Sequence, residues 1–348
     1  MPSLLDIPRE LRDQVCFYVL LSSSATAQPG ASQTPDTNSS FEKLTGSRSI
    51  YENPRLRAWS RVVLYDPANS RIMPPSLLLV NKQLHYETLS NLELIAKHPN
   101  CSMDLIMVDE VVLLPTWTHV PYRHATKFDT VDVTFRISGA YDKKKKYPFD
   151  SYKGFRIGDG AGPAMGWQIY AVLERFIRAG TNAEMRTPDA HLHVTARTIR
   201  VDVQTPPGVD PRRFTRRPRS GYGRRMQNNG ADVLDPEFLA SYVKGQVGGL
   251  LRSASHEWFT YGQILYEHLD EVIVCKDGTE IGRWDVAECL DARQVESKYF
   301  SREEMEEYKR KAWELRRSRG LKMLDGTRAA DVTDSNSTGV QLPDYFAY

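Results

Sequence analysis

The chain of 348 residues carries 46 lysines and arginines against 44 aspartates and glutamates, so its formal net charge is only +2. Hydrophobic residues make up 41% of the sequence and charged residues 26%, a composition typical of globular proteins, which excludes fibrous and wholly disordered classes. The length predicts two domains, or one large domain with insertions. Because the net charge is small, any attraction to nucleic acid or to a membrane surface has to come from a local cluster.

The cysteines and the N-terminus predict an intracellular protein, either cytoplasmic or nuclear. The four cysteines are widely separated and form no C-x-x-C pair, which is typical of a reducing compartment. Charged residues between Asp6 and Asp13 occupy the place where a signal peptide needs its apolar stretch. No later window approaches the length of apolar sequence that a membrane span requires, so we expect no membrane association.

The first element in chain order is a helix that is predicted to begin at Pro8. Proline is tolerated at the first helical position because its missing N–H would have no partner there. Apolar residues between Leu11 and Leu20 form a broad stripe, and charged residues such as Arg9 and Arg12 fill the first turns. The stripe predicts that one face of this helix packs against something.

A polar insertion follows the first helix. Residues 22–49 are rich in Ser, Thr, Pro and Asn, and they offer too little apolar surface to offset the entropy of ordering, so we expect disorder there. Order is predicted to resume with a strand over 58–65. Two prolines then precede a second segment with helical apolar spacing, over 76–96.

Residues 100–320 are predicted to form a body of the α/β or α+β class, with a mixed sheet flanked by helices. Apolar and polar residues alternate over 128–135, 196–203 and 268–274, and each pattern fits a strand with one solvated face. Amphipathic helices are expected between these strands. The other expected elements are helices over 164–179, 235–252 and 297–319, one long strand or two short ones over 103–114, a hairpin turn at Asp277-Gly278, and a disordered tail over 325–348.

The N-terminal segment resembles the opening of an F-box. Residues 4–11 read LLDIPREL, and the F-box pattern is leucine, apolar, proline, any residue, glutamate, leucine and then an apolar helix. The PRELRD form resembles the F-box-like domain of fungal proteins, and residues 77–87 (LLLVNKQLHYE) resemble the segment that follows it there. The resemblance implies a helical module formed by 1–21 and 74–98. The intervening insertion departs from the family pattern.

In that family the F-box binds the Skp-type linker subunit of a cullin–RING ubiquitin ligase, and the rest of the chain recruits a protein client. The resemblance therefore implies a non-enzymatic adaptor, and it supplies no catalytic residues. The residues themselves predict an apolar helix face that a partner covers. The alternative is that this face packs on the chain's own second helix and sheet. The candidate partner contacts are Leu4, Leu5, Ile7, Pro8, Leu11 and Val15.

An arginine-rich loop, residues 206–231, is the second candidate site. Seven arginines fall within residues 212–225, and Phe214 and Tyr222 are interleaved with them. Guanidinium groups neutralise phosphates and aromatic rings stack on bases, so this composition is typical of a nucleic-acid contact. A nuclear-import signal and a plain solvated loop have the same composition. The arginines are Arg212, Arg213, Arg216, Arg217, Arg219, Arg224 and Arg225.

An enzyme with a nucleotide site is the third alternative, because the glycine-rich run 158–166 precedes a predicted helix. Pro163, however, occupies the third glycine position of G-x-G-x-x-G, and no Lys-Ser or Lys-Thr follows. A flexible loop is the simpler interpretation. The histidines and cysteines match no metal or nucleophile spacing, so we expect no enzyme activity, no metal and no cofactor.

Overall fold

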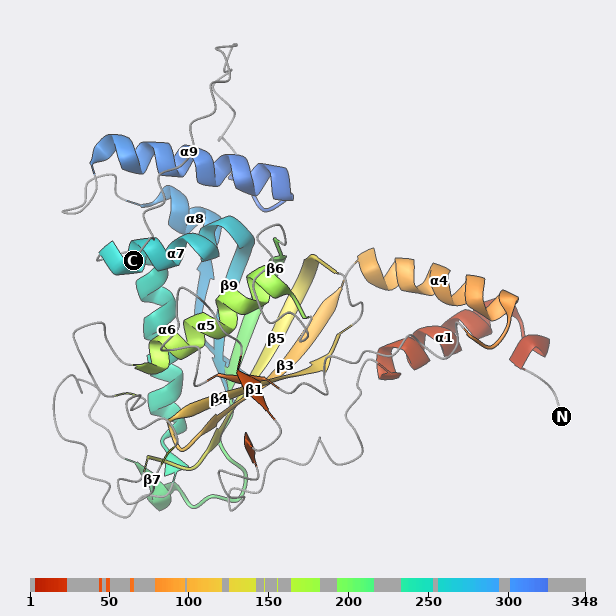
Figure 1. Ribbon diagram of the computed structural model, residues 1–348, viewed down its shortest axis with the longest axis horizontal. Helices are drawn as coiled ribbons and strands as arrows, with labels where there is room; N and C mark the ends of the chain where they lie inside the picture. The colour runs from red at the N-terminus through yellow and green to blue at the C-terminus, as the bar shows by residue number, and fades with distance from the viewer. Residues whose placement is uncertain are drawn as a thin grey trace, which may run out of the picture.

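The structure is a computed structural model, in which a six-stranded sheet carries helices on one face and a pair of N-terminal helices lies to one side of it (Figure 1). The α/β fold class and the mixed sheet with flanking helices are therefore confirmed. The residues that the structure describes are 4–23, 44–45, 48–50, 63–65, 79–97, 99–120, 125–141, 147, 155, 164–181, 193–215, 233–252, 256–293 and 301–324.

The sheet has the strand order β10-β9-β6-β5-β3-β4. The four central strands are parallel, and each outer strand is antiparallel to its neighbour, so a hairpin closes each side of the sheet. The strands are β3 (Asn100–Val108), β4 (Val112–His119), β5 (Lys127–Ser138), β6 (Thr195–Val203), β9 (Leu269–Lys276) and β10 (Thr279–Asp285).

The alternating segments of the sequence become the three inner parallel strands. Val131 of β5 lies opposite Ile199 of β6, which in turn lies opposite Val272 of β9. All three side chains are buried in one core cluster beneath the helices. Strand prediction from alternation is thus confirmed here, and the pairing register adds that these residues form one row across the sheet.

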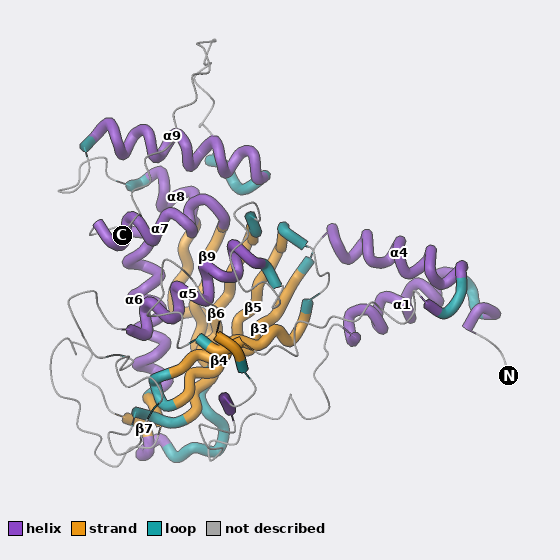
Figure 2. The backbone as a smooth tube through the Cα atoms, viewed as in Figure 1, coloured by secondary structure: helices purple, strands orange, loops and turns teal. Residues whose placement is uncertain are grey.

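The body helices cover one face of the sheet because the parallel strands follow each other in sequence order. Right-handed crossovers between successive neighbours place every connecting helix on the same side, and Figure 2 shows α5 lying across the strands. Two further helices follow β10 and pack into the same core. The helices are α5 (Ala164–Ala179), α6 (Pro236–Arg252), α7 (His256–His268), α8 (Val286–Asp291) and α9 (Arg302–Arg319).

A tight turn joins the two strands of each hairpin. Residues 103–114 form two strands rather than one, because Asp109 and Glu110 adopt positive φ angles of 50° and 61° and reverse the chain. The Asp277-Gly278 turn is confirmed, with φ angles of 49° and 79°. Thr205 fixes that turn by donating its backbone N–H and its hydroxyl to the Asp277 carboxylate, each over 2.7 Å.

The last helix, α9, begins later than the predicted residue 297. Ser301 accepts a hydrogen bond from the N–H of Glu304, whose carboxylate accepts one from the N–H of Ser301, so a capping box fixes the start. Gly320 ends the helix with a φ of 72°. Acidic residues gather in the first turn and basic residues in the last, as the sequence predicts.

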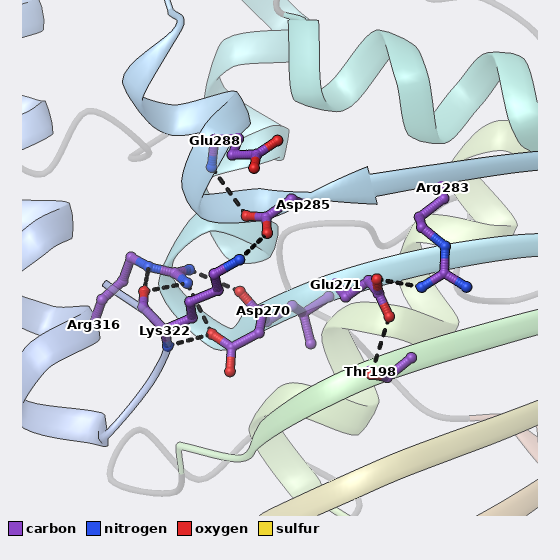
Figure 3. Close-up of polar contacts among 9 residues, drawn as sticks. Thr198, Asp270, Glu271, Arg283, Asp285, Glu288, Arg316 and Lys322 are labelled. Atoms are coloured by element: carbon purple, nitrogen blue, oxygen red, sulfur yellow. Dashed lines mark hydrogen bonds and ion pairs between the residues drawn. The ribbon is translucent and has the colours of Figure 1, made fainter. Parts of the chain in front are cut away.

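One basic residue of the last turn is not at the surface. Arg316 is fully buried, and its guanidinium donates to the backbone oxygens of Tyr266 and Leu269, each over 2.7 Å. It also forms an ion pair with Asp270 at 2.8 Å and donates to the carbonyl of Lys322 (Figure 3). This side chain therefore attaches α9 to the junction of α7 and β9.

Small strands lie at the margins of the sheet. β1 (Ser49–Ile50) pairs with β2 (Leu64–Tyr65), so the disorder expected up to residue 49 is wrong at that residue. β2 lies within the strand predicted over 58–65, of which residues 58–62 fall outside the described residues. Arg48 donates to Thr116 Oγ1 over 2.9 Å and ties β1 to β4. β7 (Phe214–Thr215) pairs with β8 (Val233–Leu234). Most of 22–49 and all of the tail 325–348 lie outside the described residues.

Candidate partner-docking surface

Helices α1 (Arg9–Ser23) and α4 (Lys82–Lys97) lie side by side and away from the sheet (Figure 1). We call residues 4–23 and 79–97 the helical pair. The carbonyl of Pro8 accepts hydrogen bonds from the next helical turn, which places the start of α1 one residue beyond the predicted one. The predicted start of α4 at residue 76 is wrong, because Asn81 caps the helix by accepting from the N–H of Leu84 over 2.9 Å.

The contact between the two helices is built around a buried ion pair. Arg12 Nε donates to Glu87 Oε2 over 3.0 Å, and Arg12 Nη2 donates to Glu87 Oε1 over 2.6 Å. The two residues are only 7% and 6% exposed. Gln83 donates a third hydrogen bond to the same carboxylate over 3.1 Å. The sequence placed Arg12 among surface charges of the first turn, and the structure buries it instead.

Both members of this pair are charged at neutral pH. Hydrogen bonds from Arg12 hold the pKa of Glu87 below its ordinary value, against the opposing effect of desolvation. The hydrogen bond to Glu87 correspondingly raises the pKa of Arg12. Bidentate arginine–carboxylate pairs combine charge with fixed geometry, so this contact sets how the two helices align.

Beside the ion pair, the helical pair buries Leu20 and Leu84 together with small and polar side chains. Asn91 donates to Asp13 Oδ1 over 3.1 Å and to the carbonyl of Glu87 over 2.9 Å. Cys16 and Thr88 are fully buried. Burial is the largest cause that raises the pKa of the Cys16 thiol, followed by the charges of the nearby carboxylates, so this thiol is neutral.

The apolar stripe of α1 faces outward. Leu11, Val15, Tyr18 and Val19 are 49%, 40%, 70% and 38% exposed, although their three- and four-residue spacing places them on one face of the helix. An amphipathic helix usually buries such a face. Here α1 buries the neighbouring face of Arg12, Cys16 and Leu20 against α4 and leaves the apolar stripe uncovered by the described residues.

The second helix repeats this pattern. Tyr86 and Leu89 of α4 are exposed, as are Leu79 and Val80 in the turn before it. Across the described residues, every large apolar side chain that is exposed belongs to the helical pair. A concentration of exposed apolar surface on one small module is characteristic of a binding surface.

The structure gathers the six predicted contact residues on this module. Leu5, Pro8, Leu11 and Val15 are exposed, whereas Leu4 and Ile7 are half-buried. Arg12 also holds the segment before α1, because its Nη1 donates to the carbonyl of Ile7 over 2.5 Å and to that of Leu5 over 3.3 Å.

The contribution of the second helix was not predicted. Tyr86, Leu89, Leu79 and Val80 were not among the candidate contacts, because their spacing predicted only a helix over 76–96. One indication in the sequence that Leu79 and Val80 precede the helix is the asparagine at position 81, which ends the apolar run 77–80 and caps α4.

Only two arginines of the arginine-rich loop lie within the described residues. Arg212 and Arg213 are exposed in a short 3-10 helix, Pro211–Arg213, which Asp210 caps by accepting from the N–H of Arg212 over 2.9 Å. Exposure of these two arginines is as expected. The remaining five fall outside the described residues, and import or nucleic-acid contact stays a prediction.

The described residues add no observation in favour of the enzyme alternative. The glycine-rich positions 158–163 lie outside them, and residues 164–166 are the first residues of α5. Within the described ranges, no three His, Cys, Asp or Glu side chains converge as a metal site would require. None of the helices in those ranges has the length and apolarity that crossing a membrane would require.

The opposite face of the sheet carries paired charges, although on its β3–β4 side Ile106 and Leu114 are buried in a separate apolar cluster with Leu64 and Tyr147. Arg136 of β5 pairs with Asp104 of β3. Arg283 of β10 pairs with Glu271 of β9 (Figure 3). These side chains alternate along their strands with the buried core residues, so they point away from the helices. Because their charges are paired across neighbouring strands, this face carries no concentrated charge of one sign.

Comparison with family models, with curated proteins and with solved structures found no significant match.

Proposed function

We propose that the helical pair is a docking module for a protein partner, and that the chain acts as a non-enzymatic adaptor. The F-box-like sequence of residues 4–11 makes the Skp-type linker subunit of a cullin–RING ubiquitin ligase the expected partner. In this role the α/β body recruits a protein client. The single observation that carries the proposal is the exposed apolar stripe of Leu11, Val15 and Tyr18 on a helix that meets α4 through a different face.

Covering this stripe is favourable because burial of apolar surface contributes about 25 cal/mol for each Å² removed from water. Tyrosines are common at the centre of protein interfaces, where they combine a large apolar ring with a hydroxyl. Tyr18 and Tyr86 are the most exposed aromatic side chains among the described residues, at 70% and 69%. The composition of the module therefore suits a helix-in-groove contact.

The alternative is that the stripe packs on the chain's own second helix and sheet. In the described part of the chain, α1 instead meets α4 through Arg12, Cys16 and Leu20. The contact with α4 thus uses Arg12, Cys16 and Leu20, and not the Leu11 and Val15 that internal packing of the stripe would bury. This arrangement favours an external partner for the stripe.

The test is binding of the purified full-length chain to a purified Skp-type linker subunit. Replacing both Leu11 and Val15 with Asp places two charges on the stripe, and we expect the affinity to fall at least 100-fold, since a desolvated charge is strongly disfavoured in an apolar contact. Ser241→Asp on α6 is the matched control, because it adds a charge at an exposed helical position of the body.

Two results would contradict the proposal. The first is an absence of binding by the wild-type chain. The second is equal affinity for the wild type and the Leu11→Asp/Val15→Asp variant. If the variant loses the far-ultraviolet helical signal as well as binding, the stripe packs internally, and the alternative is correct.

A further inference from the structure

The core between the sheet and the body helices contains a cavity of about 110 Å³. Its floor is formed by side chains of β3, β5, β6 and β9, and its walls by α5, α6 and α7. Protein interiors are normally packed as densely as organic crystals, with few voids larger than a water molecule. A natural cavity of this size therefore calls for an explanation.

Two valines on the floor of the cavity mark its position. Val133 of β5 lies opposite Val201 of β6, and both are only half-buried. The residues two positions before and after each of them are buried, at 7% exposure or less, although they point to the same face. The incomplete burial is thus confined to one spot in the middle of the sheet.

The cavity opens between α5 and α6. Ile169, Tyr170 and Leu173 on α5 line it and are half-buried, and so are Val247 and Leu250 on α6. The residues on the far side of the cavity from these helices, in β3 and β9, are buried. A small molecule can therefore enter from the helix side without opening the sheet.

The Gln246 amide supplies a polar anchor beside the mostly apolar side chains that line the cavity. Gln246 of α6 lines the cavity, and its Oε1 would lie only 2.9 Å from a Cβ atom placed on Gly166. Glycine at position 166, which also lines the cavity, therefore lets the Gln246 amide and the Tyr242 hydroxyl approach α5 closely. Apolar pockets that bind small molecules typically carry a few polar groups that orient the ligand.

We propose that this cavity binds a small aromatic molecule that carries one hydrogen-bonding group, of the size of phenol. An apolar cavity of about 150 Å³ engineered in another protein binds benzene, so the volume here suits a single ring. The ring would lie over Val133 and Val201, and its polar group would bond to the Gln246 amide. This site is independent of the docking module.

The test is titration of the full-length chain with phenol and with benzene, followed by protein NMR and by thermal shift. We expect saturable binding of both probes, with phenol bound about three- to tenfold more tightly, as one net hydrogen bond would give. Val133→Phe fills the cavity and should abolish binding of both probes. Gln246→Leu keeps the apolar walls and should remove only the preference for phenol.

Gln14→Leu on α1 is the control for the amide, because it makes the same substitution at an exposed position outside the cavity. It should leave both affinities unchanged. Lack of binding by either probe would overturn the proposal, and so would binding that survives in Val133→Phe. If Val133→Phe does not fold, Gln246→Leu still decides, because an unchanged preference for phenol excludes the anchor and overturns the site as stated.

Discussion

Arg12 of α1 and Glu87 of α4, 75 residues apart in the sequence, form a two-point ion pair at the centre of a helix–helix contact. The same guanidinium holds the carbonyls of Leu5 and Ile7, so one side chain fixes both helices and the segment that precedes them. A polar contact of this kind aligns the helices, and the apolar stripe of α1 that includes Leu11 and Val15 stays exposed.

The first prediction concerns this ion pair. Arg12→Met leaves the Glu87 carboxylate in the contact without its guanidinium, so we expect α1 and α4 to separate. Amide hydrogen exchange over 82–97 should become faster, while exchange in α5 should stay the same. The double variant Arg12→Met/Glu87→Met should restore slow exchange, because two apolar groups of similar size replace the pair. Unchanged exchange in the single variant would show that other contacts hold the helices together.

The second prediction concerns the attachment of α9. Arg316→Met removes the charge partner of Asp270 and leaves two backbone carbonyls without their donor. Breaking a buried, hydrogen-bonded pair typically costs about 3–5 kcal/mol of unfolding free energy. Arg317→Met, at the next and exposed position of α9, should change stability little. Urea denaturation measures the free energy of unfolding of both variants. Equal values for the two variants would contradict the anchoring role of Arg316.

The third prediction is a pH dependence that arises from His268. Desolvation, together with the charge of Arg319, lowers the pKa of His268 to about 3. Its Nδ1 lies 2.7 Å from the carbonyl of Val194, and its Nε2 lies 3.0 Å from Arg319 Nη1. Since arginine can only donate, Nε2 accepts and Nδ1 carries the proton.

The folded chain therefore excludes a proton that the unfolded chain binds below pH 6.5. The contribution of His268 to the free energy of unfolding is fully present above pH 6.5. Below pH 6.5 it falls by about 1.4 kcal/mol for each pH unit. His268→Asn should remove the His268 contribution to the slope between pH 6.5 and pH 5.5, above the ordinary pKa values of carboxyl groups. Parallel slopes in urea titrations of wild type and variant would contradict the assignment.

The fourth prediction concerns the packing of α6 against α7. A Cβ atom at Gly262 would lie 2.3 Å from the backbone oxygen of Leu250, so Gly262→Ala forces the two helices apart. Overpacking of this kind typically costs about 1–3 kcal/mol. Gly245→Ala in α6 meets no atom within 4 Å and should stabilise the helix by about 0.5–1 kcal/mol. Thermal unfolding of the two variants should therefore shift in opposite directions, and a stable Gly262→Ala protein would contradict the close approach.

The regular body elements could be predicted because their signals are local. The helix predicted over 164–179 matches α5 residue for residue, and the Asp277-Gly278 turn has the expected backbone conformation. Apolar periodicity and turn chemistry depend on residues close together in the chain. Helices α7 and α8 were not predicted, since their short segments adjoin strands and show no clear amphipathic pattern over several turns.

The buried arginines could not be predicted because their partners are distant in the sequence. Arg12 pairs with Glu87, and Arg316 pairs with Asp270, 46 residues earlier. In isolation each arginine matches a solvated helix face, and only the fold shows the carboxylates and carbonyls that permit burial. The exposure of the docking stripe could not be predicted for the same reason, because its spacing predicted an apolar face but not that α4 would cover the face of Arg12, Cys16 and Leu20 instead.

The most direct measurement of the docking account is hydrogen exchange of the full-length chain with and without the Skp-type linker subunit. The account predicts protection within 4–23 and 79–97, centred on Leu11 and Val15, and no change in the central strands of the sheet. Protection confined to the sheet or the body helices, or the absence of a complex, would contradict the assignment of the helical pair as the docking surface.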